Sequence, residues 1–131
     1  MNGKLEEPKD EKPRDIRARS FEYALRAVKL YQHLQEQRDG AGWVLGKQYL
    51  RAATSIGANI EEAQASESRA DFVHKLGIAQ NEARESLFWL RLLSETQIVS
   101  STKLNPLLGE TEELVAVITS IVVNAKKKQR R

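Results

Sequence analysis

The 131-residue chain contains no cysteine, which excludes a disulfide framework, a thiol nucleophile and any cysteine-ligated zinc or iron–sulfur site. Three prolines and seven glycines are too few for a loop-rich or collagen-like chain. No apolar run approaches the roughly 18 residues that a membrane span needs, and the first 20 residues lack the apolar stretch of a signal peptide. We therefore expect one soluble, cytoplasmic domain without a membrane partner.

Charged residues are numerous, but the positive ones are concentrated at the C-terminal end of the sequence. The chain has 21 basic and 18 acidic residues, a net charge of +3. Residues 126–131 alone carry five positive charges, so the other 125 residues sum to −2. The five cations are Lys126, Lys127, Lys128, Arg130 and Arg131. A basic tail of this kind attracts polyanions such as RNA, DNA and anionic lipid, and it is equally typical of a solubilising chain end.

The hydrophobic pattern predicts an all-α protein. Residues 1–14 hold one large apolar residue and two prolines, and we expect them to be disordered. Residues 15–125 show a period of 3.6 residues, with helices predicted over about 15–37, 43–66, 68–97 and 103–127. No alternating strand pattern competes with them. Four helices with short connections predict an antiparallel up-down-up-down four-helix bundle, followed by the basic tail at 126–131.

The first predicted helix has more apolar surface than a single core requires. One stripe consists of Phe21, Ala24, Leu25 and Val28, and a second consists of Tyr23, Ala27, Leu30 and Leu34. The third helix likewise has a second stripe, with Ile78, Trp89 and Leu92. Surplus apolar surface usually marks an interface, so we expect association with copies of itself. The alternative is that both stripes are buried inside one wide bundle.

Two segments resemble a known family. Residues 49–63 read YLRAATSIGANIEEA, and residues 78–93 read IAQNEARESLFWLRLL after an Asp-Phe pair at 71–72. Together they are similar to the bacterial four helix bundle protein family, also called S23 ribosomal protein-like. Its founding members are encoded by intervening sequences in 23S rRNA genes, and the accessory protein of diversity-generating retroelements is a relative. The resemblance implies a four-helix bundle and a ring of five subunits.

The chain departs from the family pattern at two places. Residues 61–63 are Glu-Glu-Ala where many members have Ala-Glu-Gly, and residues 81–82 are Asn-Glu where some have Gly-Ser. The Asn-Glu form at residues 81–82 occurs in a recognised branch of the family. The two departures therefore put in question the function that the resemblance implies, but not the fold.

The polar residues of the two motifs predict a structural network between the second and third helices. Its expected members are Arg51, Asn59, Glu82 and Glu85. Asn59 lies at the margin of an apolar stripe and needs a hydrogen-bond partner, for which a carboxylate of the third helix is a natural choice.

Enzyme chemistry finds little support. The only histidines are His33 and His74, and a carboxylate-bridged di-iron bundle would need Glu-x-x-His on two helices. We expect surface histidines, no metal, no cofactor and no catalytic activity.

Two functions remain. The first is binding of RNA or DNA through Lys47 and Arg51, on the polar side of the second helix, and through the basic tail. The alternative is an adaptor that binds another protein, as the retroelement relative does for its reverse transcriptase.

Overall fold

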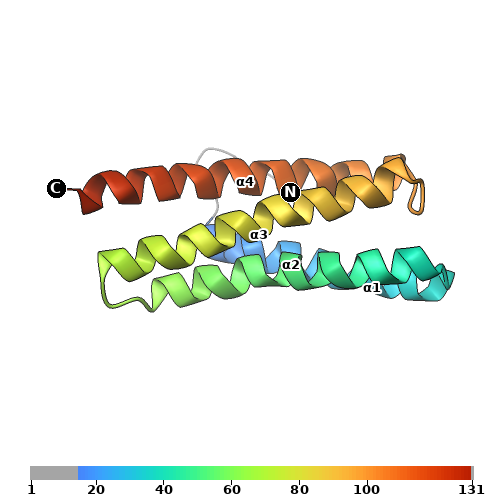
Figure 1. Cartoon of the computed structure of the whole chain (residues 1–131), viewed down its shortest axis with the longest axis horizontal. Coiled ribbons are helices and arrows are strands. Elements are labelled where there is room, and N and C mark those ends of the chain that lie inside the picture. Colours follow the sequence, from blue (N-terminus) through green and yellow to red (C-terminus); the bar gives the residue numbers. More distant parts are fainter. Residues whose placement is uncertain (1–14, 131) are drawn as a thin grey trace, which may run out of the picture.

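A computed structural model of the chain describes residues 15–130, which form four helices and no strand. The helices are α1 (Ile16–Gln37), α2 (Gly40–Gln64), α3 (Arg69–Glu95) and α4 (Ser101–Gln129). In Figure 1 the α1–α2 and α3–α4 connections lie at one end of the molecule and the α2–α3 connection at the other. The predicted all-α class is confirmed. The segment 1–14, expected to be disordered, lies outside the described residues, as does Arg131.

Each helix begins at a side chain that caps its free backbone N–H groups. Ser68 Oγ accepts from the Asp71 N–H at 3.0 Å, just where the sequence predicts that the third helix begins. The other caps, each accepting a backbone N–H, are Asp15, Asp39 and Ser100.

The turn between α1 and α2 is shorter than the sequence predicted. The predicted helix ranges leave residues 38–42 as the connection, but only Arg38 and Asp39 lie between the two helices. Asp39 Oδ1 accepts from the Gly42 N–H at 2.8 Å and thereby starts α2 at Gly40. A Cβ added at Gly42 would lie 2.9 Å from the Ile98 side chain. Gly42 therefore serves close packing rather than the turn.

The last helix is longer than expected at both ends. It begins at Ser101 and continues through Gln129, so Lys126, Lys127 and Lys128 occupy its last turn instead of a separate tail. Cations at this end are favourable because the last carbonyl groups of a helix carry partial negative charge.

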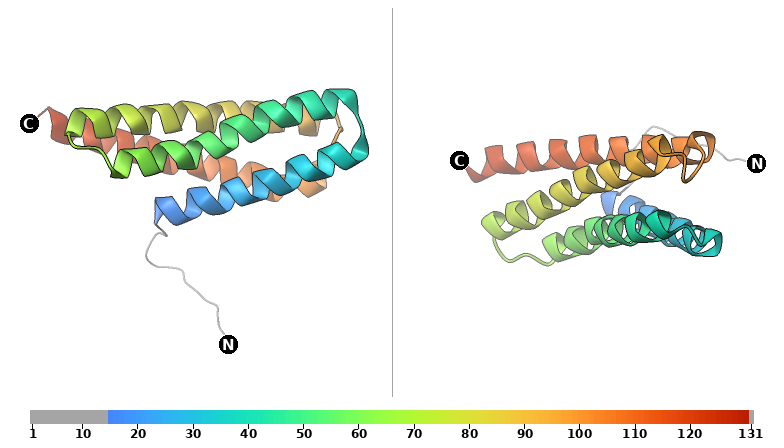
Figure 2. Two further views of the ribbon diagram at one scale, coloured as in Figure 1. Left: turned by 90° about the horizontal axis from the view of Figure 1, so that it is seen from below. Right: turned by 45° about the vertical axis from the view of Figure 1, so that its right-hand side comes forward.

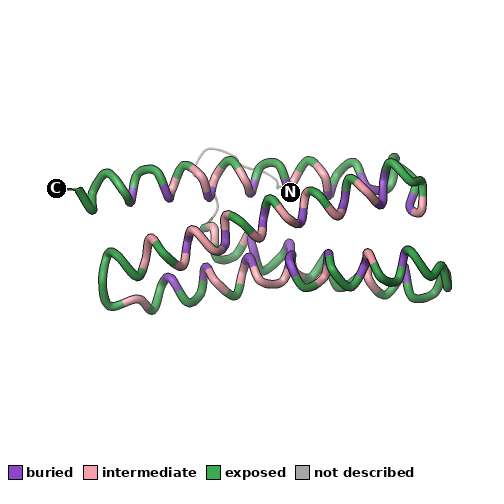
Figure 3. Tube along the Cα trace, in the orientation of Figure 1, coloured by how far each residue is buried: buried purple, intermediate pink, exposed green. Residues whose placement is uncertain are grey.

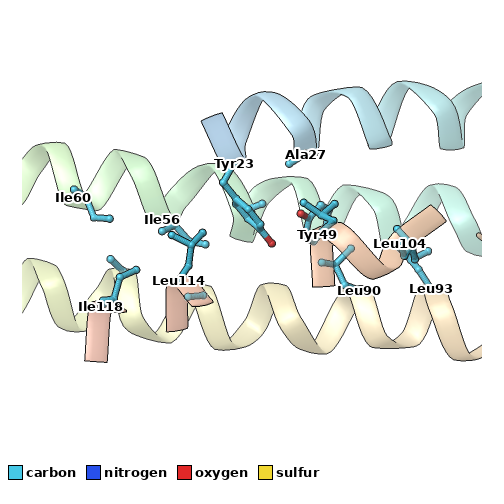
Figure 4. Close-up of a cluster of buried hydrophobic side chains, with 14 of the residues drawn as sticks. Tyr23, Ala27, Tyr49, Ile56, Ile60, Leu90, Leu93, Leu104, Leu114 and Ile118 are labelled. Carbon is cyan, nitrogen blue, oxygen red and sulfur yellow. The ribbon is translucent and has the colours of Figure 1, made fainter. Parts of the chain in front are cut away.

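The core lies along the inward faces of all four helices (Figure 3). On α2 the inward stripe at positions 49, 52, 53, 56, 60 and 63 is buried, and Leu45, which continues it, is partly exposed. Figure 4 shows how Tyr23 and Ala27 of α1 meet side chains of the other three helices. Gly57 of α2 lies against α1, where an added Cβ would be 3.4 Å from the Ser20 carbonyl oxygen, so this glycine allows the two helices to pack closely.

Contacts between the helices are unequal. The most extensive helix pair is α2 with α3, followed by α1 with α2 and by α3 with α4. The backbones of α1 and α4 come close to each other at only a few positions. Figure 2 shows α1 and α2 on one side and α3 and α4 on the other. Side chains bridge α1 to α4: Arg19 forms an ion pair with Glu110 at 2.8 Å, and Tyr23 hydrogen-bonds to Thr111 at 2.6 Å.

Candidate functional site

An ion-pair network joins α2 to α3, as the sequence predicted for three of its four members. The Arg51 guanidinium contacts Glu82 at 3.5 Å and also binds Glu85 Oε2. That same oxygen accepts a hydrogen bond from the Trp89 indole N–H at 3.0 Å. The hydrogen bonds from Trp89 and Arg51 hold the pKa of Glu85 below its ordinary value. Two carboxylates thus compensate the charge of Arg51, which favours a structural role over contact with nucleic acid.

The fourth expected member, Asn59, does not belong to this network. Its amide Nδ2 donates to the Ser55 carbonyl on its own helix at 2.9 Å, so no carboxylate of α3 is needed to satisfy it. The fourth member of the network is Trp89, which donates to Glu85. The spacing of Glu85 and Trp89, four residues apart on one helix, is the signal that could have revealed it.

The cations at the end of α4 are exposed. Lys126, Lys127, Lys128 and Arg130 make no ion pair with any described residue. By contrast, Arg17, Arg19 and Arg51 are each bound to a carboxylate of another helix. The C-terminal end of α4 is therefore the place where uncompensated positive charge is most concentrated among residues 15–130.

Lys47 lies apart from that cluster. It is exposed on α2, and its Nζ lies 4.5 Å from the centroid of the Trp43 ring. Lys47 belongs to the part of α2 near the α1–α2 connection, whereas α4 ends at the opposite end of the bundle (Figure 1). The predicted nucleic-acid residues therefore fall into two separate places on one chain.

The surplus apolar stripe of α1 is exposed. Phe21 is 64% exposed, Leu25 49% and Val28 39%, while the other stripe of α1 contributes to the core. The interpretation that both stripes of this helix are buried in one wide bundle is wrong. On α3, the second stripe is partly buried, with Trp89 packed against the core.

An apolar groove accompanies this stripe on the outer side of α1 and α2. It runs beside Phe21 and Ala24 of α1, and its floor includes Gly57 and Ala58 of α2. Gly57 and Ala58 leave room for the groove, because neither projects a large side chain. The Arg17–Glu61 ion pair, at 3.0 Å, borders it.

The described residues offer no metal-binding group of three or more His, Asp or Glu side chains. His33 Nε2 lies 3.2 Å from the Gln37 amide on α1, and His74 is exposed on α3. Within residues 15–130, none of the helices is long and apolar enough to cross a membrane.

Four helices in one bundle, with charged networks between them, define a helical-bundle protein. The model of the 23S rRNA-intervening sequence protein family matches residues 13–120, and the chain belongs to that family. A solved structure from Bacteroides thetaiotaomicron, a protein of unknown function from the S23 ribosomal protein family, is 40% identical with a TM-score of 0.77. The similarity covers 82% of this chain and 98% of that one. Among curated proteins, none matches significantly.

Proposed function

We propose that this chain is a non-enzymatic subunit that associates with copies of itself and binds nucleic acid, in particular RNA, in the cytoplasm. The exposed cations on the last turn of α4 carry the nucleic-acid proposal, because they are uncompensated by any described carboxylate. The family name, which refers to an intervening sequence of 23S rRNA, supports RNA over DNA. We also propose that the bundle has the antiparallel up-down-up-down order.

Phosphate contacts by lysines release counterions, so binding should weaken steeply with salt. The variant Lys126→Ala/Lys127→Ala/Lys128→Ala should lower RNA affinity and reduce the slope of log K against log salt by roughly 0.7 for each lost contact. Gel shifts with RNA and DNA between about 50 and 200 mM salt measure both.

The matched control removes the same charge elsewhere. Lys29, Arg84 and Lys103 are also exposed, and their triple alanine variant should bind nearly as the unaltered chain does. Equal losses in both variants would mean that net charge alone drives binding. Absence of any binding at about 50 mM salt would overturn the nucleic-acid proposal.

Association rests on the exposed stripe of α1. An aromatic and two aliphatic side chains at positions i, i+4 and i+7 form one continuous apolar face, which a second copy would remove from water. Following the family resemblance, we propose a ring of five subunits. Sedimentation velocity should then show five times the 14.8 kDa chain mass.

Leu25→Glu should dissociate the assembly, because it places a charge in the middle of that face. Gln32→Glu adds the same charge at an exposed polar position of α1 and should leave the assembly intact. A 14.8 kDa species for the unaltered chain would contradict the proposal.

The adaptor function is the second candidate, and one observation favours it. Phe88 is 55% exposed and, with Arg91, Leu92 and Glu95, lines a shallow depression on α3. A protein that co-purifies after nuclease treatment, and that Phe88→Glu releases, would favour the adaptor over nucleic-acid binding.

A further inference from the structure

An exposed indole lies near the α1–α2 connection, with one cation before it and one after it in the sequence. Trp43 is 44% exposed, although tryptophan is a side chain with much apolar area to lose from water. Lys47 follows one turn later and places its Nζ 4.5 Å from the ring centroid. Arg38 precedes it, exposed and held in the left-handed region with φ of 56°. Neither cation forms an ion pair with a residue in the range 15–130.

A shallow hollow opens beside this indole. Its lining consists of Gln35, Arg38, Asp39, Gly40 and Trp43. Lys47 is not part of the lining, although its Nζ lies over the Trp43 ring. Gly40 contributes no side chain, and an added Cβ there would meet nothing within 4 Å, which leaves the approach to the hollow open.

The polar groups of the hollow suit the edge of a planar, hydrogen-bonding ligand. Gln35 offers an amide with a donor nitrogen and an acceptor oxygen, and its Nε2 also donates to the Tyr31 hydroxyl at 3.5 Å. Asp39 is the one acidic side chain of the lining, and its carboxylate is engaged by the Gly42 N–H at the start of α2. Positive charge lies in the hollow and beside it, since Arg38 is part of the lining and Lys47 lies over the Trp43 ring.

Aromatic side chains with adjacent cations are the recurrent means of holding unpaired bases, since every base has a face that stacks and a phosphate on each side. We propose that the Trp43 hollow binds one unpaired nucleotide of a single-stranded nucleic acid. The base stacks on the indole, and the neighbouring phosphates contact Arg38 and Lys47. This inference rests on the proposed nucleic-acid function and assigns it a site distinct from the end of α4.

The chain has two tryptophans, so Trp89→Phe leaves Trp43 as the sole indole. This variant, in its assembled state, is titrated with ten-residue oligo(U), ten-residue oligo(dT) and a duplex of equal length. Single strands should quench Trp43 emission in a salt-dependent manner, and the duplex should not, because its bases are already stacked. Equal quenching by both single strands indicates stacking alone, and stronger quenching by oligo(U) indicates additional recognition of the 2′-hydroxyl; both support the site.

Affinity is measured independently by gel shift on chains that keep Trp89. Trp43→Ala should weaken single-strand binding at least about fivefold, and Trp43→Phe should restore part of it because a smaller ring still stacks. Val44→Ala, at the next exposed apolar position, is the matched control and should bind normally.

The outcomes separate the two proposals. If single strands bind but Trp43 emission and the Trp43→Ala affinity are unchanged, the site is overturned and the general nucleic-acid function stands. If iodide fails to quench Trp43 in the free assembly, another copy covers the indole and the site is likewise overturned. If no nucleic acid binds at low salt, both proposals fail.

Discussion

Two buried tyrosines offer a matched test of the core, because one hydroxyl has a hydrogen-bond partner within the described part of the chain and the other does not. Tyr23 and Tyr49 are both at most 1% exposed, and their rings meet edge to face with centroids 6.3 Å apart. The Thr111 hydroxyl donates to the Leu107 carbonyl at 2.7 Å, so its only hydrogen is already used. Tyr23 Oη therefore donates to Thr111 Oγ1 at 2.6 Å. Tyr49 Oη is buried and has no hydrogen-bond partner among residues 15–130.

Removing each hydroxyl should change stability in opposite directions. A buried, unpaired polar group costs about 1–3 kcal/mol, so Tyr49→Phe recovers most of that cost. The oxygen leaves a small void, which subtracts a few tenths of a kcal/mol. We expect Tyr49→Phe to raise the free energy of unfolding by about 0.5–2 kcal/mol.

Tyr23→Phe removes a satisfied hydrogen bond instead. A typical net contribution is about 1 kcal/mol, and Thr111 keeps its bond to Leu107 after the change. The free energy of unfolding should fall by roughly that amount. For a domain of this size, 1 kcal/mol corresponds to a shift of roughly 3–6 °C in Tm.

Urea unfolding followed by circular dichroism measures both variants at one protein concentration, so that association does not differ between them. The two substitutions delete the same atom from neighbouring rings, and hydrophobicity therefore changes equally. If Tyr49→Phe destabilises the protein by as much as Tyr23→Phe, Tyr49 Oη has a partner such as a buried water, and the reasoning fails.

Two further predictions concern packing and pH. Gly46→Ala should destabilise the protein by about 1–3 kcal/mol, because the added Cβ would lie 2.8 Å from Leu34 Cδ1. At Gly77 an added Cβ would meet nothing within 4 Å, so Gly77→Ala should stabilise the protein by about 0.5–1 kcal/mol. Thermal unfolding of both variants decides whether the available space is the cause. The pKa of Glu85 is lowered in the folded state, chiefly by the Trp89 hydrogen bond, so its contribution is present above its ordinary pKa and is lost as the pH falls through the folded pKa. Glu85→Gln should therefore lower Tm at pH 7 and cease to do so in strong acid; a Tm difference that is constant with pH would contradict this.

The helices could be predicted from the sequence because their signals are local. The 3.6-residue period placed the inward faces, and Ser68 marked a helix start that the structure has. The end of α1 was also clear. The start of α2 could not be predicted correctly, because Gly40 and Gly42 normally favour a turn. Only the close approach of Ile98 to Gly42 explains why a glycine is needed inside the helix.

The polar network could be predicted only in part, since side-chain partners depend on how helices are rotated against one another. Arg51 and Glu85 have charges that reveal a partner, whereas an amide such as Asn59 can satisfy itself on its own helix. The hollow at Trp43 had no sequence signal at all. Its residues come from the end of one helix and the start of the next, and only the sharp turn at Arg38 brings them together.

The proposed association and the proposed nucleic-acid sites use different parts of the bundle, and this separates their effects. The apolar stripe of α1 lies along the side of a helix, whereas the cations of α4 lie at its end. If the proposed assembly forms through the sides, it would leave the ends accessible and multiply them, and a strand long enough to reach several subunits would gain affinity through effective concentration. Leu25→Glu should then weaken binding of a long RNA by about tenfold or more while leaving a ten-residue oligonucleotide unaffected. Fluorescence anisotropy with both lengths measures this. Equal loss for both would mean that the α1 face itself contacts the nucleic acid, and the division of roles along the bundle would be wrong.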